Sequence, residues 1–84
     1  MKIKVRFFHD FREITGKKEI DIEINRTITI KDVLKILEDY FPGIKKITKY
    51  PEDYSVLLNN VYSKLTANLK DNDIVDLFII IDGG

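Results

Sequence analysis

A single segment with helical periodicity lies between segments whose apolar residues alternate with polar ones. In residues 30–41 the apolar side chains recur at three- and four-residue spacing, as in a helix that buries one face. In the flanking segments they recur every second residue, which is typical of strands. A chain of 84 residues has room for one small hydrophobic core. The sequence therefore predicts one helix that covers one face of one sheet.

The predicted helix has a recognisable beginning and end. Thr29 is a favourable N-cap residue, and Asp32 follows it at the spacing of a capping box. Pro42 and Gly43 end the helix. Its apolar face is predicted to contain Val33, Leu34, Leu37, Tyr40 and Phe41.

Alternation and turn residues place the strands. We expect the first two strands over about residues 2–8 and 19–24, as antiparallel neighbours. A short helical turn over residues 9–15, ended by Gly16, would join them. Residues 44–53 are lysine-rich and irregular, and we expect a loop there. The remaining strands are predicted at residues 55–58, 61–62 and 74–81, with turns at Asn59–Asn60 and at residues 69–73.

The order of these elements favours a β-grasp, or ubiquitin-like, α+β fold. A mixed sheet of about five strands would pack on one main helix, with a short helix after the first strand. The helical crossover indicates that the first and last strands pair in parallel at the centre of the sheet. Residues 1–81 would form the domain and residues 82–84 a flexible tail. A roll-like α+β fold with the same elements is the alternative.

The composition argues against several classes of function. Fourteen Lys and Arg balance fourteen Asp and Glu, whereas a nucleic-acid-binding domain should carry a basic excess. The sequence has neither an apolar run that could span a membrane nor a recognisable signal peptide, so a cytoplasmic protein is expected. With no Cys and a single His, His9, we expect no metal centre, no catalytic triad and no bound cofactor. A carrier or binding domain is therefore expected rather than an enzyme that acts alone.

Strand alternation places apolar side chains on the face of the sheet that points away from the helix. Phe8 falls on that face after the first strand, and Phe78 and Ile80 fall on it in the last strand. Tyr62 could extend this group. Such a patch often marks a surface that binds a partner. The alternatives are that loops cover this face or that Phe8 folds inward.

The last three residues are Asp82, Gly83 and Gly84. Glycine lets a backbone enter a narrow channel and approach reactive groups without a Cβ in the way. The α-carboxylate of Gly84 is then the most plausible reactive group. A carboxylate is a poor electrophile, so an ATP-using partner would first have to activate it, for instance as an acyl-adenylate.

Six segments spread over the whole chain match a known family in their order and spacing. They are Ile3–Phe8, Phe11–Gly16, Thr29–Leu34, Leu58–Asn60, Leu69–Val75 and Gly83–Gly84. In these segments the sequence resembles the small sulfur-carrier subunit of molybdopterin synthase. That family has a β-grasp fold and is related to the sulfur carrier of thiazole synthesis and to ubiquitin.

The resemblance implies a mechanism and a set of partners. An E1-like enzyme would adenylate Gly84 with ATP and magnesium, and a sulfurtransferase would supply the sulfur of a C-terminal thiocarboxylate. The large subunit of molybdopterin synthase would bind the carrier, accept its tail through Asp82 and Gly83, and pass the sulfur to a pterin precursor. By the same resemblance, the hydrophobic docking surface corresponds to Phe8, Tyr62 and Phe78.

The sequence departs from the family pattern at two places. Many family members have Gly in place of Asn72, but Asn tolerates the same left-handed conformation. Many also have prolines before the terminus, where this sequence has residues 78–82, and this second departure leaves alternatives open. The sulfur acceptor could therefore be a pterin precursor or a tRNA base. The chain could also be a ubiquitin-like modifier joined to lysines of other proteins. In a further alternative it is a passive β-grasp binding module in which Gly83 and Gly84 have no role.

Overall fold

The computed structural model describes residues 1–80. Ile81, which was predicted to end the last strand, and the predicted tail at residues 82–84 lie outside the described residues. The described strands are β1 (Lys2–Phe7), β2 (Glu19–Glu23), β3 (Tyr54–Leu58), β4 (Val61–Tyr62) and β5 (Ile74–Ile79). The helices are α1 (Asp10–Thr15), α2 (Ile30–Tyr40) and α3 (Lys45–Thr48), with the 3₁₀ turns η1 (Pro42–Ile44) and η2 (Pro51–Asp53).

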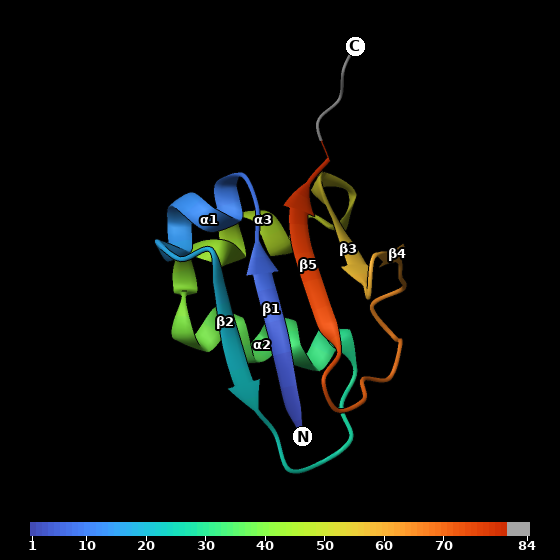
Figure 1. Cartoon of the computed structure of the whole chain (residues 1–84). Coiled ribbons are helices and arrows are strands. Elements are labelled where there is room, and N and C mark those ends of the chain that lie inside the picture. Colours follow the sequence, from blue (N-terminus) through green and yellow to red (C-terminus); the bar gives the residue numbers. More distant parts are fainter. Residues whose placement is uncertain (81–84) are drawn as a thin grey trace.

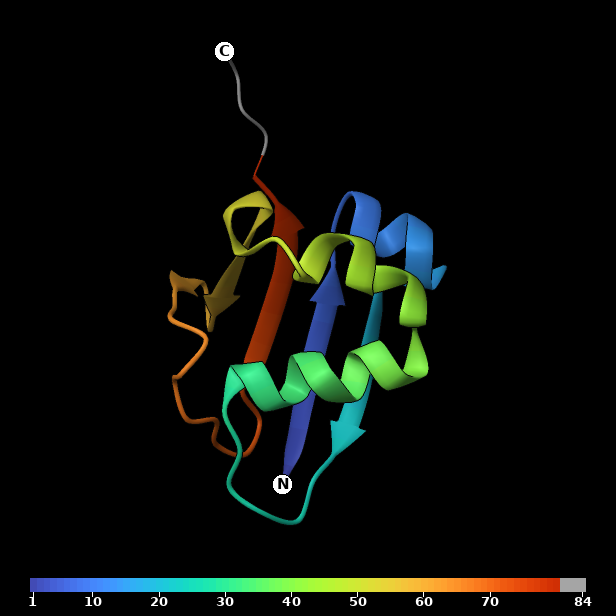
Figure 2. The same ribbon diagram turned by 180° about the vertical axis from the view of Figure 1, so that it is seen from behind.

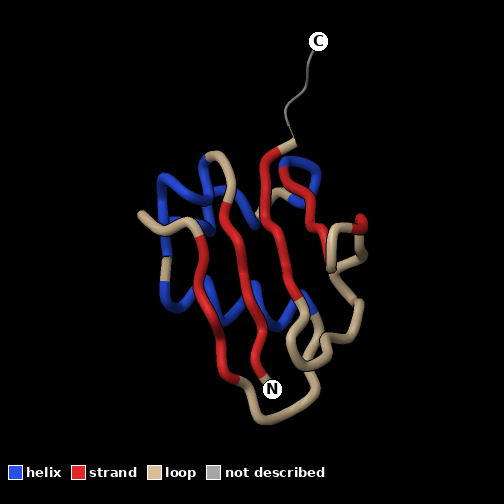
Figure 3. The backbone as a smooth tube through the Cα atoms, in the orientation of Figure 1, coloured by secondary structure: helices blue, strands red, loops and turns tan. Residues whose placement is uncertain are grey.

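Within residues 1–80, the five strands form one mixed sheet in the order β2-β1-β5-β3-β4 (Figures 1 and 3). The central strands β1 and β5 run parallel, and the other neighbours are antiparallel. Helix α2 crosses one face of this sheet (Figure 2). The α+β, ubiquitin-like architecture and the central parallel pair that the sequence predicted are confirmed.

The core lies between α2 and the inner face of the sheet. Ile3, Val5 and Phe7 of β1 are fully buried, as alternation predicted. The ring of Phe7 meets that of Phe41 edge-on, with 5.9 Å between ring centroids. The other fully buried large side chains include Phe11, Ile28, Ile30, Val33, Leu37, Ile44, Val75 and Leu77.

Two predictions were wrong: the loop at residues 44–53 and the position of Tyr40 on the core face of the helix. Residues 44–53 do not form a plain loop, because this stretch holds the last residue of η1 and the whole of α3 and η2. Ile44 and Ile47, three residues apart, are both buried, and the intervening lysines hid this helical spacing. Tyr40 is 70% exposed rather than part of the core face. It is the last residue of α2 and lies beside β2, which is the edge strand of the sheet within residues 1–80.

The turns use asparagine where the backbone needs a left-handed conformation. Asn59 and Asn60 have φ values of 51° and 71°, and Asn72 has φ 69°, as the turn predictions required. The side chain of Asn59 also ties the two turns together. Its amide donates to the carboxylate of Asp73 at 2.9 Å, and its carbonyl accepts the N–H of Ile74 at 2.9 Å.

The predicted capping box at the start of α2 is present. The Thr29 hydroxyl accepts the N–H of Asp32 at 3.3 Å, and the Asp32 carboxylate accepts the N–H of Thr29 at 2.9 Å. The backbone hydrogen bond from Thr29 lowers the pKa of Asp32. The carboxylate therefore contributes stability above its unfolded-state pKa, and that contribution is lost as the pH falls through the folded pKa.

We predict that Thr29→Ala lowers the free energy of unfolding by about 1 kcal/mol at neutral pH, because a donor at the helix start loses its partner. Urea denaturation measures the change. The exposed Thr27 provides the control Thr27→Ala, which should have little effect. The deficit of Thr29→Ala should shrink in acid, because the Thr29 hydroxyl also donates to the Asp32 carboxylate at 3.1 Å. Equal stability of Thr29→Ala and the original protein at neutral pH would contradict the capping role.

Candidate functional site

The face of the sheet opposite α2 carries an apolar cluster, which we call the outer-face patch: Phe8, Leu57, Tyr62 and Phe78. Phe8, Leu57 and Phe78 line a shallow hollow of about 240 Å³ together with His9 and Asp76. The ring of Tyr62 packs against that of Phe78, with 6.2 Å between centroids, and 74% of Tyr62 is exposed. The patch is thus a half-buried aromatic floor with one exposed tyrosine at its border.

The structure brings together most of the residues that the sequence predicted for docking. Phe8 follows β1 directly and does not fold into the core; its N–H donates to the Leu77 carbonyl at 3.0 Å. Phe8 and Phe78 share the hollow, and Tyr62 contacts Phe78. Ile80 is 50% exposed just beyond β5 and is not among the residues that line the hollow. The predicted tail residues Asp82, Gly83 and Gly84 lie outside the described residues.

An ion pair that the sequence analysis missed borders this patch. Arg6 donates to both carboxylate oxygens of Asp76, through Nε at 2.5 Å and through Nη2 at 2.8 Å. Asp76 is 4% exposed, although it lies on the outer face. The hydrogen bond to Asp76 raises the pKa of Arg6. Nη2 also approaches the side-chain oxygen of Asn60 at 3.4 Å, so the pair links β1, β5 and the β3–β4 turn.

The sequence did not reveal this ion pair because the register between the parallel strands β1 and β5 was unknown. Arg6 is two residues before Phe8 and Asp76 is two residues before Phe78, so alternation puts both on the outer face. In the structure they are opposite residues in the β1–β5 register. A bidentate pair in this position covers the carboxylate and gives the face a fixed polar centre beside the aromatic floor.

Arg12 adds a second cationic contact that the sequence did not reveal. Its guanidinium lies 5.6 Å from the ring centroid of Phe8, within the range of a cation–π interaction. Its Nε donates to the Phe7 carbonyl at 3.2 Å, which holds the side chain there. Helix α1, which begins after His9 and ends at Gly16 with φ 71°, therefore positions a charge over the border of the patch.

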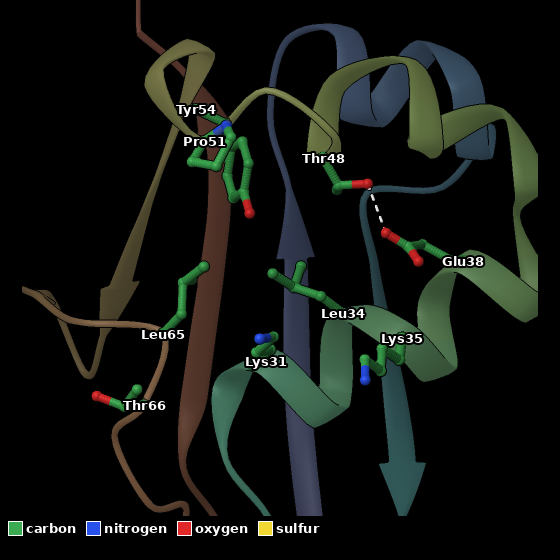
Figure 4. A pocket seen from close by; sticks show the side chains of 9 residues that line it. All are labelled: Lys31, Leu34, Lys35, Glu38, Thr48, Pro51, Tyr54, Leu65 and Thr66. Atoms are coloured by element: carbon green, nitrogen blue, oxygen red, sulfur yellow. Dashed lines mark hydrogen bonds between the residues drawn. The ribbon is translucent and has the colours of Figure 1, made fainter.

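A second hollow lies on the helix side of the molecule, between α2, η2 and the segment after β4 (Figure 4). It holds about 350 Å³. The Thr48 hydroxyl donates to the Glu38 carboxylate at 2.6 Å, and burial together with the charge of Glu38 raises the pKa of Tyr54. The ring of Tyr54 packs edge-on against that of Phe11, with 6.1 Å between ring centroids. The lining residues are Lys31, Leu34, Lys35, Glu38, Thr48, Pro51, Tyr54, Leu65 and Thr66.

The arrangement on the outer face is suited to binding a protein partner. Residues 1–80 contain no cluster of acidic and histidine side chains that could hold a metal ion. None of the helices in this part of the chain has the length and apolar character needed to cross a membrane. The feature that stands out is an aromatic floor with fixed ionic neighbours, which matches the composition of protein-docking surfaces.

Comparison with known proteins identifies a matching family and a curated relative. The sequence matches the ThiS family over residues 5–84. Small archaeal modifier protein 3 of Haloferax volcanii is 39% identical over 44 residues, a match that spans 52% of this chain and 48% of that protein. The chain thus aligns with about half the length of this curated relative.

Solved structures share the fold. SAMP1 from Haloferax volcanii superposes with a TM-score of 0.85 over the whole of both chains, at 21% identity. A complex of subunits 1 and 2 of molybdopterin-converting factor from Helicobacter pylori contains a chain with 26% identity and a TM-score of 0.68, again over the whole of both chains. The first likeness concerns the fold alone. The second shows that a chain of this kind is found together with a partner subunit.

The Arg6–Asp76 pair can be tested with a double-mutant cycle. We predict that Asp76→Ala lowers the free energy of unfolding by about 2 kcal/mol, between the values for surface and buried pairs, because Asp76 is buried and Arg6 partly exposed. Arg6→Ala and the double variant should reveal a coupling of about 1 kcal/mol in urea denaturation. Strict additivity would show that the pair does not stabilise the sheet. Glu19→Ala, which breaks an exposed pair with Lys4, is the control and should matter far less.

Proposed function

The chain belongs to the ThiS family of small ubiquitin-like sulfur carriers and modifiers, and we propose that it carries sulfur as a thiocarboxylate on Gly84. The single observation that supports this most is the family match, which extends over residues 5–84 and includes the Gly83–Gly84 pair. In this role the protein is a co-substrate rather than an enzyme.

The position of β5 supports such a carrier. This strand is in the middle of the sheet and pairs with β1 and β3, so the segment that precedes the tail is firmly held. The Ile80 N–H donates to the Asp53 carbonyl at 3.0 Å, which holds the backbone just after β5. The four residues that follow could reach about 13 Å if extended. Residues 81–84 could therefore enter a site of a partner docked on the outer-face patch if that site lies within this reach of Ile80.

The chemistry belongs to the partners. An E1-like enzyme would transfer AMP from ATP to the Gly84 carboxylate, release pyrophosphate and leave an acyl-adenylate. The terminal sulfur of a sulfurtransferase persulfide would then displace AMP and form an acyl disulfide. A thiol of the partner enzymes would attack the sulfur on the sulfurtransferase side of that disulfide, form a new disulfide with it and release the Gly84 thiocarboxylate. The chain itself would hold neither ATP nor magnesium. We place these steps in the cytoplasm, where ATP is available.

We propose the pterin precursor of molybdopterin as the sulfur acceptor, with the large synthase subunit as the docking partner. The complex of the Helicobacter pylori converting factor supports this, because it pairs a chain of this fold with a second subunit. The outer-face patch, Ile80 and the residues Asp82 and Gly83 would form the contact surface on this side. Tyr62 and Phe78 would supply much of the binding energy, since aromatic residues dominate such interfaces.

A second candidate, a ubiquitin-like modifier or a carrier for tRNA thiolation, is favoured by a different observation. The matched part of the curated relative belongs to a protein called a small archaeal modifier. In that case the same activated Gly84 would be attacked by a lysine amine, or its sulfur would be passed to a tRNA base. A third role, as a passive β-grasp module, requires only the patch.

The carrier role predicts a change in the intact mass of the protein. After incubation with ATP, a sulfur source and the E1-like enzyme of the same organism, an oxygen-to-sulfur exchange should map to Gly84. A variant that lacks Gly83 and Gly84 should stay folded and unconverted. If the full chain stays unconverted while a control carrier is converted by the same enzyme, the proposal is wrong for this activator.

The product of the reaction then distinguishes the possible acceptors of the sulfur or of the activated Gly84. Sulfur transfer to the pterin precursor in the presence of the large subunit would support the first proposal. Lysine residues that carry a Gly-Gly remnant would favour the modifier role, and a thiolated tRNA base would favour the tRNA role. Retained function after deletion of Gly83 and Gly84 would favour the passive module.

Docking should depend on the patch. We predict that Tyr62→Ala weakens binding to the large subunit about tenfold, because an exposed aromatic anchor is removed while the core is untouched. Isothermal titration calorimetry measures the affinity, and circular dichroism checks the fold. Tyr50→Ala is the matched control, because Tyr50 is also exposed but is not in the patch. Equal effects of the two variants would contradict docking on this face.

A further inference from the structure

The edge of the sheet furthest from β3 and β4 is open. Strand β2 is the outermost strand on that side, and within residues 1–80 its one strand neighbour is β1 (Figures 1 and 3). An edge strand presents a row of backbone N–H and C=O groups that can pair with another chain. This edge is separated from the outer-face patch by β1, so it is a distinct surface.

The hydrogen bonds between β1 and β2 show which backbone groups of β2 point away from the sheet. The Phe7 N–H donates to the Lys18 carbonyl, and the Ile24 N–H donates to the Met1 carbonyl, both at 2.8 Å. Bonded pairs alternate along an antiparallel ladder, so the even-numbered residues of β2 bond to β1. The backbone groups of Glu19, Asp21 and Glu23 therefore point away from the sheet.

A groove runs along this same edge. Its volume is about 390 Å³, and it lies between β2 and the end of α2, which crosses the sheet toward this edge (Figure 2). Ile20, Ile22 and Phe41 give it an apolar floor, the exposed Tyr40 forms a wall, and Asp21 and Glu23 also border it. The placement of Tyr40, which the amphipathic pattern of α2 did not explain, becomes intelligible as part of this groove.

The outer side of the same edge is acidic. The side chains of Glu19, Asp21 and Glu23 are exposed, and strand alternation directs them to the face opposite that of Ile20 and Ile22. In the β1–β2 register Asp21 is opposite Lys4 and Glu23 is opposite Lys2. The Lys4 ammonium, however, pairs with Glu19 at 2.8 Å. Asp21 and Glu23 are therefore the acids best placed to attract a cation on a strand added at the edge.

We propose that the β2 edge binds an extended segment of a partner protein in which apolar and basic residues alternate. Side chains of an added strand point alternately to the two faces of the sheet. Those on the inner side would enter the groove of Ile20, Ile22, Tyr40 and Phe41. Those on the outer side would lie next to Asp21 and Glu23, where lysine or arginine gives favourable cross-strand pairs. The backbone groups of β2 would supply the hydrogen bonds of such an addition.

Charge also disfavours a second copy of this chain at the same edge. An edge-to-edge pair of two β2 strands would bring acidic side chains of both copies together, which is destabilising. The proposal does not depend on the proposed function. It leaves the outer-face patch and Gly84 available, so the domain could be held by one protein while another uses its patch and tail.

The test uses the full chain and a capped peptide, GKVKIKVKG, in a ¹⁵N–¹H NMR titration. Amide shifts should change most at residues 19–23 and at Tyr40 and Phe41. In the control peptide GKKKKVIVG the same residues are grouped into a basic block and an apolar block. It should bind at least about fivefold more weakly, since it cannot match both faces of the sheet. Equal binding of the two peptides, shifts centred on Phe8 and Phe78, or no shift at millimolar peptide would overturn the proposal.

Variants of the protein test separately whether peptide binding requires the acidic side chains and whether it requires the groove. Asp21→Lys combined with Glu23→Lys changes exposed side chains and should reverse the preference toward the acidic peptide GEVEIEVEG. Tyr40→Ala should weaken binding of GKVKIKVKG, whereas the control Tyr50→Ala should not, because Tyr50 is exposed outside the groove. An unchanged preference in the charge variant, or equal effects of the two tyrosine variants, would also overturn the proposal.

Discussion

The parallel pairing of β1 with β5 is the constraint on which the rest of the structure depends. It places both strands at the centre of the sheet, with Val5 opposite Val75 and Phe7 opposite Leu77 under α2. On the other face the same register sets Arg6 against Asp76 and brings Phe8 to the hollow that Phe78 lines. Core, ion pair and outer-face patch are therefore consequences of one register. A shift by one residue would exchange the faces and destroy all three.

Most of the fold could be predicted because its signals are local. The capping residues Thr29 and Asp32, the asparagine turns and the alternation of Ile3, Val5 and Phe7 each act over a few residues. The short helices after Pro42 were missed because their apolar positions are only Ile44 and Ile47, too few to define a period. Tyr40 was misplaced because the end of a helix can extend past the sheet that it covers.

The site was predictable only in part, for the same reason. Alternation identified the face of Phe8 and Phe78, but the contacts of Arg6 with Asp76 and of Arg12 with Phe8 depend on register and on the path of α1. The β2 edge was also hidden, because its groove needs the position of α2 relative to the sheet. Sequence patterns give faces and periods, whereas grooves and ion pairs come from the assembly of distant segments.

The central pair also controls the order in which such a chain can be completed. Arg6 and Asp76 are separated by 70 positions, so the middle of the sheet cannot close until nearly the whole described chain has been synthesised. A nascent chain that stops before β5 would expose the edges of β1 and β3, a state that invites aggregation or proteolysis. Contacts of such long range also slow folding. Synthesis of β5 is thus a structural checkpoint, because the sheet closes only when this strand has been added between β1 and β3.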